Sequence, residues 1–154
     1  MVLRFLQIII LLVQGGFFMK DKLFNSIKVL SYFLWEYTNY DNTLKLWCCA
    51  EDIVCFLAEN NIKTKENFMA IIYSDKTSEE YKEFIRNISY KIFDYTDIED
   101  NEKNWFIAEK FIKNYECIDA CVTAIEVFSQ IEKNDSIYKS IRSENAREYI
   151  SYKL

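Results

Sequence analysis

Five cysteines, Cys48, Cys49, Cys55, Cys117 and Cys121, are the residues whose type and spacing come nearest to a metal site. Cys117 and Cys121 are four residues apart and would share one face of a helix. Cys48 and Cys55 also share a face, but a helical rise of seven residues separates them by roughly 10 Å, too far for both to ligate one zinc ion. A split site of Cys117, Cys121 and one cysteine of the other helix would lack an obvious fourth ligand. We therefore expect no metal, and interpret the cysteines as small buried side chains in a reducing cytoplasm.

The residue types that are missing exclude most other chemistry. The chain has no histidine, which rules out Ser-His-Asp triads, Cys-His pairs and histidine-ligated zinc. No glycine follows Gly16, so the glycine-rich loops that bind nucleotide phosphates cannot form. We expect no catalytic residues and no cofactor, and hence a protein that is not an enzyme.

Carboxylates cluster at Glu51-Asp52, at Glu79-Glu80 with Glu83, and from Asp97 to Asp100. Such pairs can perform acid–base catalysis when burial separates their pKa values. Two of the three clusters lie at predicted helix starts, where acidic side chains stabilise the helix dipole. Helix capping accounts for them without a catalytic role.

Aromatic residues make up 17% of the chain, and two of them lie off the predicted core stripes. At 100° per residue, Tyr32 and Trp35 point away from the apolar line of their helix. Lys28 and Glu36 give this face a charged edge. Tyrosine and tryptophan with a polar rim are typical of protein–protein contacts, so these four residues are the candidate partner-binding site. The alternative is that both faces of this helix are covered.

One six-residue string resembles a known motif. Residues 86–91, from Arg86 and Asn87 to Lys91, resemble the Arg-x4–6-His motif of HEPN domains, helical modules that cleave or accompany RNA. Lys91 stands where the histidine would fall, so the resemblance implies a helical RNA-associated protein without nuclease activity. Arg142 and Arg147 lie in a locally basic C-terminal stretch and complete the candidate nucleic-acid-binding residues. The net charge of −5 disfavours general nucleic-acid binding.

The elements that must position these residues are helices. Without Gly or Pro after residue 16, the chain lacks the usual residues of tight β-turns, and asparagines are expected to end helices instead. Candidate breaks are Asn39, Asn42, Asn60-Asn61 and Asn134. Apolar periodicity predicts helices over about 21–38, 42–59, 65–73, 77–93, 96–115, 117–131 and 136–152.

Particular residues define these helices. Thr77 with Glu80, and Thr96 with Glu99, predict capping boxes. The first helix should bury Leu23, Ile27, Leu30, Leu34 and Tyr37, and the helix after Thr96 should align Ile98, Trp105, Ala108, Ile112 and Tyr115. Residues 117–131 are apolar around most of their circumference, which is typical of a central helix. The prediction is a single all-α domain, residues 19–154, with six or seven helices packed around 117–131.

Residues 1–18 are predicted to lie outside this domain. Gln14-Gly15-Gly16 can be encoded by DNA that contains AAGGAGG, a bacterial ribosome-binding sequence, shortly before a start codon at Met19. We interpret 1–18 as translated upstream sequence, with an uncleaved apolar leader as the alternative. The apolar run is shorter than the roughly 20 residues of a membrane span.

These features together favour a small cytoplasmic protein that binds another protein. Its abundant Ile, Lys, Asn, Tyr and Phe suit a low-GC bacterium or its phage. The function expected is that of a phage or mobile-element inhibitor, immunity or counter-defence factor that occludes a partner enzyme. The alternative is a non-catalytic nucleic-acid-associated module, of HEPN type or a small subunit of a ribonucleoprotein.

Overall fold

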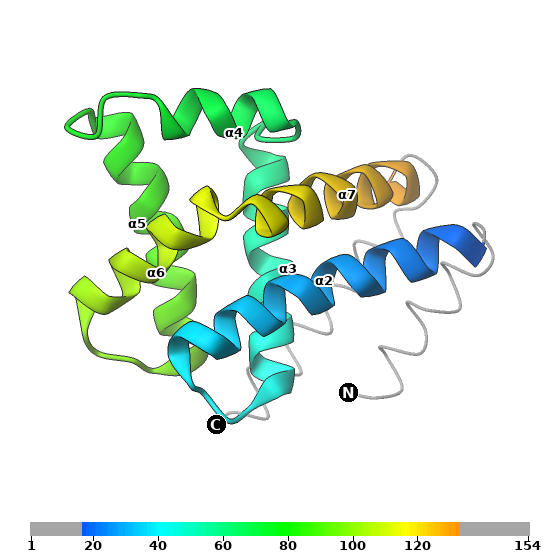
Figure 1. The fold of residues 1–154 in the computed structure, drawn as a ribbon, viewed down its shortest axis with the longest axis horizontal. Coiled ribbons are helices and arrows are strands. Elements are labelled where there is room, and N and C mark those ends of the chain that lie inside the picture. The colour runs from blue at the N-terminus through cyan, green and yellow to red at the C-terminus, as the bar shows by residue number, and fades with distance from the viewer. Residues whose placement is uncertain (1–16, 133–154) are drawn as a thin grey trace.

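The computed structural model describes residues 17–132, with side chains described for 21–130, and this part of the chain is all-helical. It holds six helices and no strand, packed as a helical bundle (Figure 1). The helices are α2 (Phe17–Thr38), α3 (Thr43–Glu59), α4 (Lys65–Ile72), α5 (Glu79–Thr96), α6 (Asn101–Lys113) and α7 (Tyr115–Glu132). The predicted all-α class is confirmed. The helix predicted over 136–152, with Asn134, Arg142 and Arg147, lies outside the described residues, as do nearly all of residues 1–18.

The connections between helices show how the backbone reverses direction in the part of the chain after residue 16, which holds no glycine. Between residues 17 and 132, three residues other than glycine adopt positive φ, namely Asn39 at 53°, Asn61 at 62° and Asp97 at 57°. Asparagine and aspartate tolerate this left-handed conformation better than other residues with a side chain. Breaks at Asn39 and Asn61 were predicted and are confirmed. Asn42 has another role, because it caps α3 by accepting a hydrogen bond from Lys45 N.

The predicted capping box of Thr77 and Glu80 is wrong by one residue. Ser78 is the N-cap of α5, and its hydroxyl accepts a hydrogen bond from Tyr81 N at 3.2 Å. Thr77 instead donates from N and Oγ1 to Asp75 Oδ1, at 2.9 and 2.7 Å. Thr77 and Ser78 are adjacent, and either hydroxyl could cap α5. Because Thr77 bonds to Asp75 in an Asx turn, Ser78 is the residue that caps the helix.

The second predicted capping box, Thr96 with Glu99, is also wrong. Thr96 is the last residue of α5, buried, with its hydroxyl donating to Ile92 O at 2.6 Å. Asp100 caps α6 by accepting from Lys103 N. Helix α5 is therefore longer than predicted and α6 shorter, so that Ile98 and Tyr115 lie outside α6.

The bundle is orthogonal. Helices α2 and α7 run side by side in opposite directions and cross α3, while α6 lies against α5, and α4 crosses one end (Figure 1). Helix α7 contacts α2, α3, α4 and α6, in agreement with its predicted central position. None of the helices in this part of the chain is both long and apolar enough to cross a membrane.

The core is built from the predicted stripes, with two corrections. Leu30 and Leu34 are fully buried on α2, but Tyr37, predicted to be in line with them, is 36% exposed. Phe33 takes its place in the core and packs edge-on against Phe111 of α6, with ring centroids 5.6 Å apart. Tyr115, predicted on the α6 stripe, begins α7 and is exposed.

Candidate functional site

The aromatic patch, defined as Tyr32 and Trp35 with Lys28 and Glu36, lies on α2. Tyr32 is 58% exposed and Trp35 42% exposed, and their ring centroids lie 5.7 Å apart at an interplanar angle of 37°. Lys28 and Glu36 are exposed on the same arc of the helix. The structure thus brings together all four residues that were predicted as a partner-binding site.

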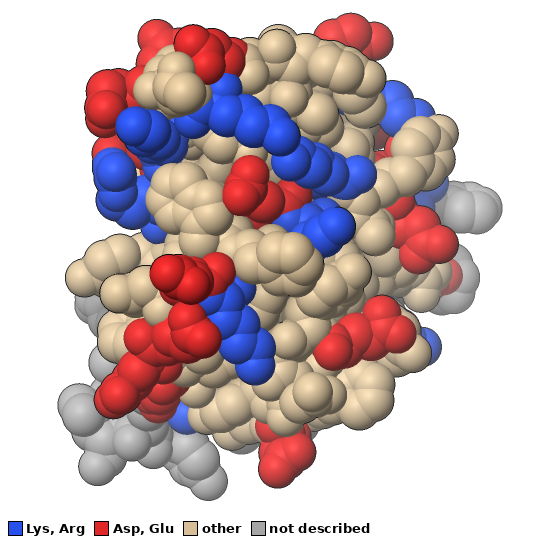
Figure 2. Space-filling model, turned by 60° about the vertical axis from the view of Figure 1, so that its left-hand side comes forward, with Lys and Arg blue, Asp and Glu red and all other residues tan. Residues whose placement is uncertain are grey.

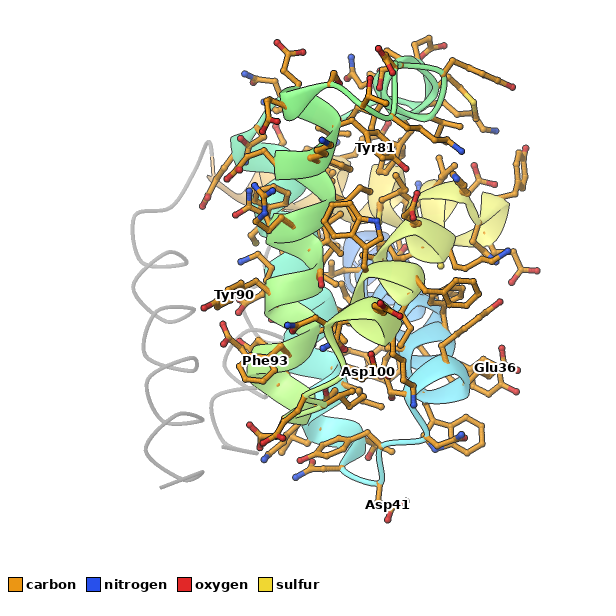
Figure 3. The ribbon with its side chains drawn as sticks, turned by 90° about the vertical axis from the view of Figure 1, so that its left-hand side faces the viewer. Glu36, Asp41, Tyr81, Tyr90, Phe93 and Asp100 are labelled. Carbon is orange, nitrogen blue, oxygen red and sulfur yellow. The ribbon has the colours of Figure 1, made fainter. Side chains whose placement is uncertain are left out.

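Helix geometry explains why this face is open. The buried stripe of α2, which includes Ile27, Leu30 and Leu34, turns toward α7 and α3. Tyr32 and Trp35 lie about half a turn away from that stripe. Glu36 projects from the edge of the molecule, away from α5 and α6 (Figure 3). The exposures of Tyr32 and Trp35 argue against the alternative in which both faces of α2 are covered.

The residues of the HEPN-like string contact neighbouring side chains and backbone of the bundle. Arg86 Nη1 lies 2.5 Å from Glu83 Oε2, and Asn87 Nδ2 donates to Glu83 O at 2.8 Å. Lys91 Nζ lies 5.7 Å from the centroid of the Phe56 ring. Five positions rotate Lys91 about 140° from Arg86 around the helix, so the two cations do not share a face. Arg142 and Arg147, the other nucleic-acid candidates, lie outside the described residues.

The cysteines are distributed between two helices. Cys49, Cys117 and Cys121 are buried, and Cys48 and Cys55 are half-buried. Burial raises the pKa of the Cys49, Cys117 and Cys121 thiols, with smaller contributions from nearby acidic groups, so these thiols stay protonated at neutral pH. Within the described residues, no three Cys, Asp or Glu side chains come together as a metal ion would require.

The carboxylates Glu51 and Asp52 bind neighbouring side chains. Trp47 Nε1 donates to Glu51 Oε1 at 2.7 Å, within one turn of α3. The Tyr95 hydroxyl donates to Asp52 Oδ2 and so joins α5 to α3. Burial, together with the charge of Asp52 and the hydrogen bond to it, raises the pKa of Tyr95. The first contact lies within α3 and the second joins two helices, so both carboxylates have structural roles, as does Asp100, the N-cap of α6.

Sequence reasoning missed a second polar cluster, where α5 meets α6. Tyr81 points from α5 toward α6 (Figure 3), and its hydroxyl donates to Glu109 Oε2 at 2.5 Å. The same Glu109 oxygen lies 3.8 Å from Lys113 Nζ. Partial burial lowers the pKa of Lys113, and the positive charge of Lys76, from the connection between α4 and α5, lowers it further. The sequence places Glu109 and Lys113 one helical turn apart, but nothing in it paired Glu109 with Tyr81.

The comparisons with known proteins found no match, so a function for this chain has to be inferred from its geometry. No protein-family model, no curated protein and no solved structure matches this chain.

Proposed function

We propose that this protein acts by binding another protein through the aromatic patch of α2. The observation that carries this proposal is the exposure of Tyr32 and Trp35, two large rings in mutual contact on a face that no other described helix covers. A buried aromatic pair contributes both apolar area and a preferred ring geometry to an interface. Tyrosine and tryptophan dominate the binding energy of many interfaces for this reason.

The surroundings of the patch support the same proposal. Lys28 and Glu36 provide one charge of each sign at its edge, which resembles the polar rim of a protein interface. An opposite pair of charges sets the orientation of a partner without strongly attracting nucleic acid. The net charge of −5 adds a general preference for partners with basic surfaces.

The proposed role is that of a small cytoplasmic inhibitor, immunity or counter-defence factor of phage or mobile-element origin, which occludes a partner enzyme. Elimination supports this role, because the sequence lacks histidine and phosphate-binding glycine loops. The buried, protonated thiols of Cys49, Cys117 and Cys121 suit a reducing compartment.

The test begins with affinity capture from the source cell, followed by measurement of the affinity for the captured enzyme and of its inhibition. Replacing both rings, Tyr32→Ala with Trp35→Ala, should weaken binding by at least about 30-fold, equivalent to about 2 kcal/mol, and relieve the inhibition. Both residues are exposed, so the variant should keep the helical circular dichroism of the parent.

The matched control replaces two exposed tyrosines elsewhere, Tyr73→Ala with Tyr90→Ala, at 82% and 63% exposure. This variant should bind the partner within about twofold of the parent, since surface changes outside an interface have small effects. Equal binding by the folded patch variant and the parent would refute the proposal.

A further inference from the structure

The residues of the aromatic patch are arranged evenly around Tyr32. Lys28 and Glu36 lie four residues before and four residues after it, displaced around the helix by about 40° to opposite sides. Val29 and Trp35 lie three residues before and after it, displaced by about 60° to opposite sides. All five side chains are exposed, including Val29 at 37%. Tyr32 is therefore the centre of this exposed surface.

The two charges of the patch are not used inside the molecule. Within the described part of the chain, neither Lys28 nor Glu36 forms an ion pair. They lie about 12 Å apart along α2, so they cannot pair with each other. The residues one turn away from each of them are uncharged. The complementary surface is therefore one that carries the same two charges in the reverse order.

A second copy of this chain offers the reverse order when two α2 helices lie antiparallel. A two-fold axis then passes between the helices at the height of Tyr32, and residues equally far before and after Tyr32 lie at the same height. Each Lys28 faces Trp35 of the second copy and lies diagonally opposite Glu36 of that copy. Its ammonium can contact the ring and pair with the carboxylate, and the symmetry makes each contact twice.

We propose that two copies of this chain associate through the aromatic patch as an antiparallel dimer, with Tyr32 at the two-fold axis. The strip from Lys28 to Glu36 is about 12 Å long, which is small for a permanent dimer interface, so the dimer is reversible. We expect a dissociation constant of about 1–100 μM. The net charge of −5 does not prevent this contact, because the face shown in Figure 2 carries basic as well as acidic side chains.

The dimer would regulate access to the patch. The dimer itself does not depend on the function proposed above, but this regulatory role rests on that function. Tyr32 and Trp35 cannot contact a second copy and another protein at the same time, so the monomer is the form that binds a partner. The apparent affinity for the partner should therefore fall as the concentration of this chain rises above the dissociation constant of the dimer.

The experiment exchanges the two charges and measures self-association of the full chain by sedimentation equilibrium. Lys28→Glu and Glu36→Lys each place like charges opposite one another in the dimer, so each variant should dimerise at least about tenfold more weakly than the parent. In an equal mixture of the two variants, opposite charges face each other again. The mixture should therefore recover the affinity of the parent to within about threefold.

Net charge alone predicts a different pattern. Lys28→Glu makes the chain more negative and Glu36→Lys makes it less negative, so general repulsion would weaken association of the first and strengthen association of the second. The matched controls Lys63→Glu and Glu59→Lys make the same changes at exposed positions where α3 ends near α4, away from α2 (Figure 1). Each control should dimerise within about twofold of the parent.

Four results would overturn the dimer: a parent that stays monomeric at about 300 μM, stronger association of Glu36→Lys, equal weakening by the controls, or a mixture that does not associate. If the parent is monomeric and Tyr32→Ala with Trp35→Ala still weakens binding of the captured enzyme, another protein occupies the patch and the proposed function stands. If the charge exchange behaves as expected and that double variant binds the enzyme like the parent, the dimer stands and the proposed function is refuted.

Discussion

At the scale of single residues, two tyrosine side chains of α5 join helices through carboxylates. Tyr81 bonds to Glu109 and Tyr95 to Asp52, so that these two tyrosines of α5 join that helix to α6 and α3. Burial, reinforced by the adjacent carboxylate, raises the pKa of both tyrosines. The buried thiols behave in the same way, because the apolar interior favours their neutral form.

These raised pKa values predict loss of stability in alkali. A thiol whose pKa is higher in the folded than in the unfolded chain stabilises the fold fully below its unfolded pKa, near 9, and this contribution is lost as the pH rises above that value. The free energy of unfolding should therefore fall between pH 8 and pH 10.5, measured by urea denaturation.

Cys121→Ala tests whether ionisation of the Cys121 thiol on unfolding contributes to this loss of stability. This variant should be less stable at pH 8 because it leaves a small cavity, but its stability should decline less steeply, by up to about 1.4 kcal/mol per pH unit. An identical slope for variant and parent would show that Cys121 does not ionise on unfolding.

At the scale of helices, the main problem is how to end them without glycine. The backbone reverses at Asn39, Asn61 and Asp97, all with left-handed φ. At Asn61 the chain leaves α3, and Ile62 N then donates back to Leu57 O at 2.9 Å, a bond typical of a helix C-terminus. The positive φ is thus part of a defined helix stop.

Glycine at that position should stabilise the protein. Asn61→Gly removes the steric cost of the left-handed conformation and should raise the free energy of unfolding by about 0.5 kcal/mol, while Asn61→Ala should lower it by about 1 kcal/mol. Chemical denaturation measures both.

The control for these variants is Asp41→Gly, at an exposed position in the connection from α2 to α3 where φ is not positive. Glycine there only adds freedom to the unfolded chain, so stability should not increase. A gain at Asp41 equal to that at Asn61 would mean that the left-handed φ is not the cause.

At the scale of the whole molecule, one continuous core connects the described helices. Phe111 of α6 is fully buried and meets Phe33 of α2 edge to face. Since α7 lies against α2, α3, α4 and α6, loss of packing at one helix pair is transmitted to the others. The described helices should therefore unfold as one cooperative unit.

Phe111→Ala should lower the free energy of unfolding by about 3–5 kcal/mol, since it empties a site at the junction of α6 and α2. Phe106→Ala is the matched control on the same helix, because Phe106 is 51% exposed and should cost less than about 1 kcal/mol. Helical circular dichroism and tryptophan fluorescence should report a single coincident transition. Similar losses for the two variants would contradict the central position of Phe111.

The sequence by itself determined the class of the fold and the direction in which Tyr32 and Trp35 leave α2, whereas their exposure was decided by the tertiary structure. Absence of glycine and proline after residue 16, with apolar side chains every three or four positions, leaves helices as the regular structure that buries enough surface. The direction of Tyr32 and Trp35 follows from the same periodicity, because side-chain orientation around a helix depends only on position along it.

The tertiary structure decided what local patterns leave open. Ser78 caps α5 in place of Thr77, and Asp100 caps α6 in place of Thr96, because neighbouring residues compete for the same backbone groups and packing selects between them. The cluster of Tyr81, Glu109 and Lys113 was not predictable either. Tyr81 belongs to α5 and the other two residues to α6, and only the docking of α6 on α5 brings these polar groups within a few ångströms, where electrostatic interactions become strong.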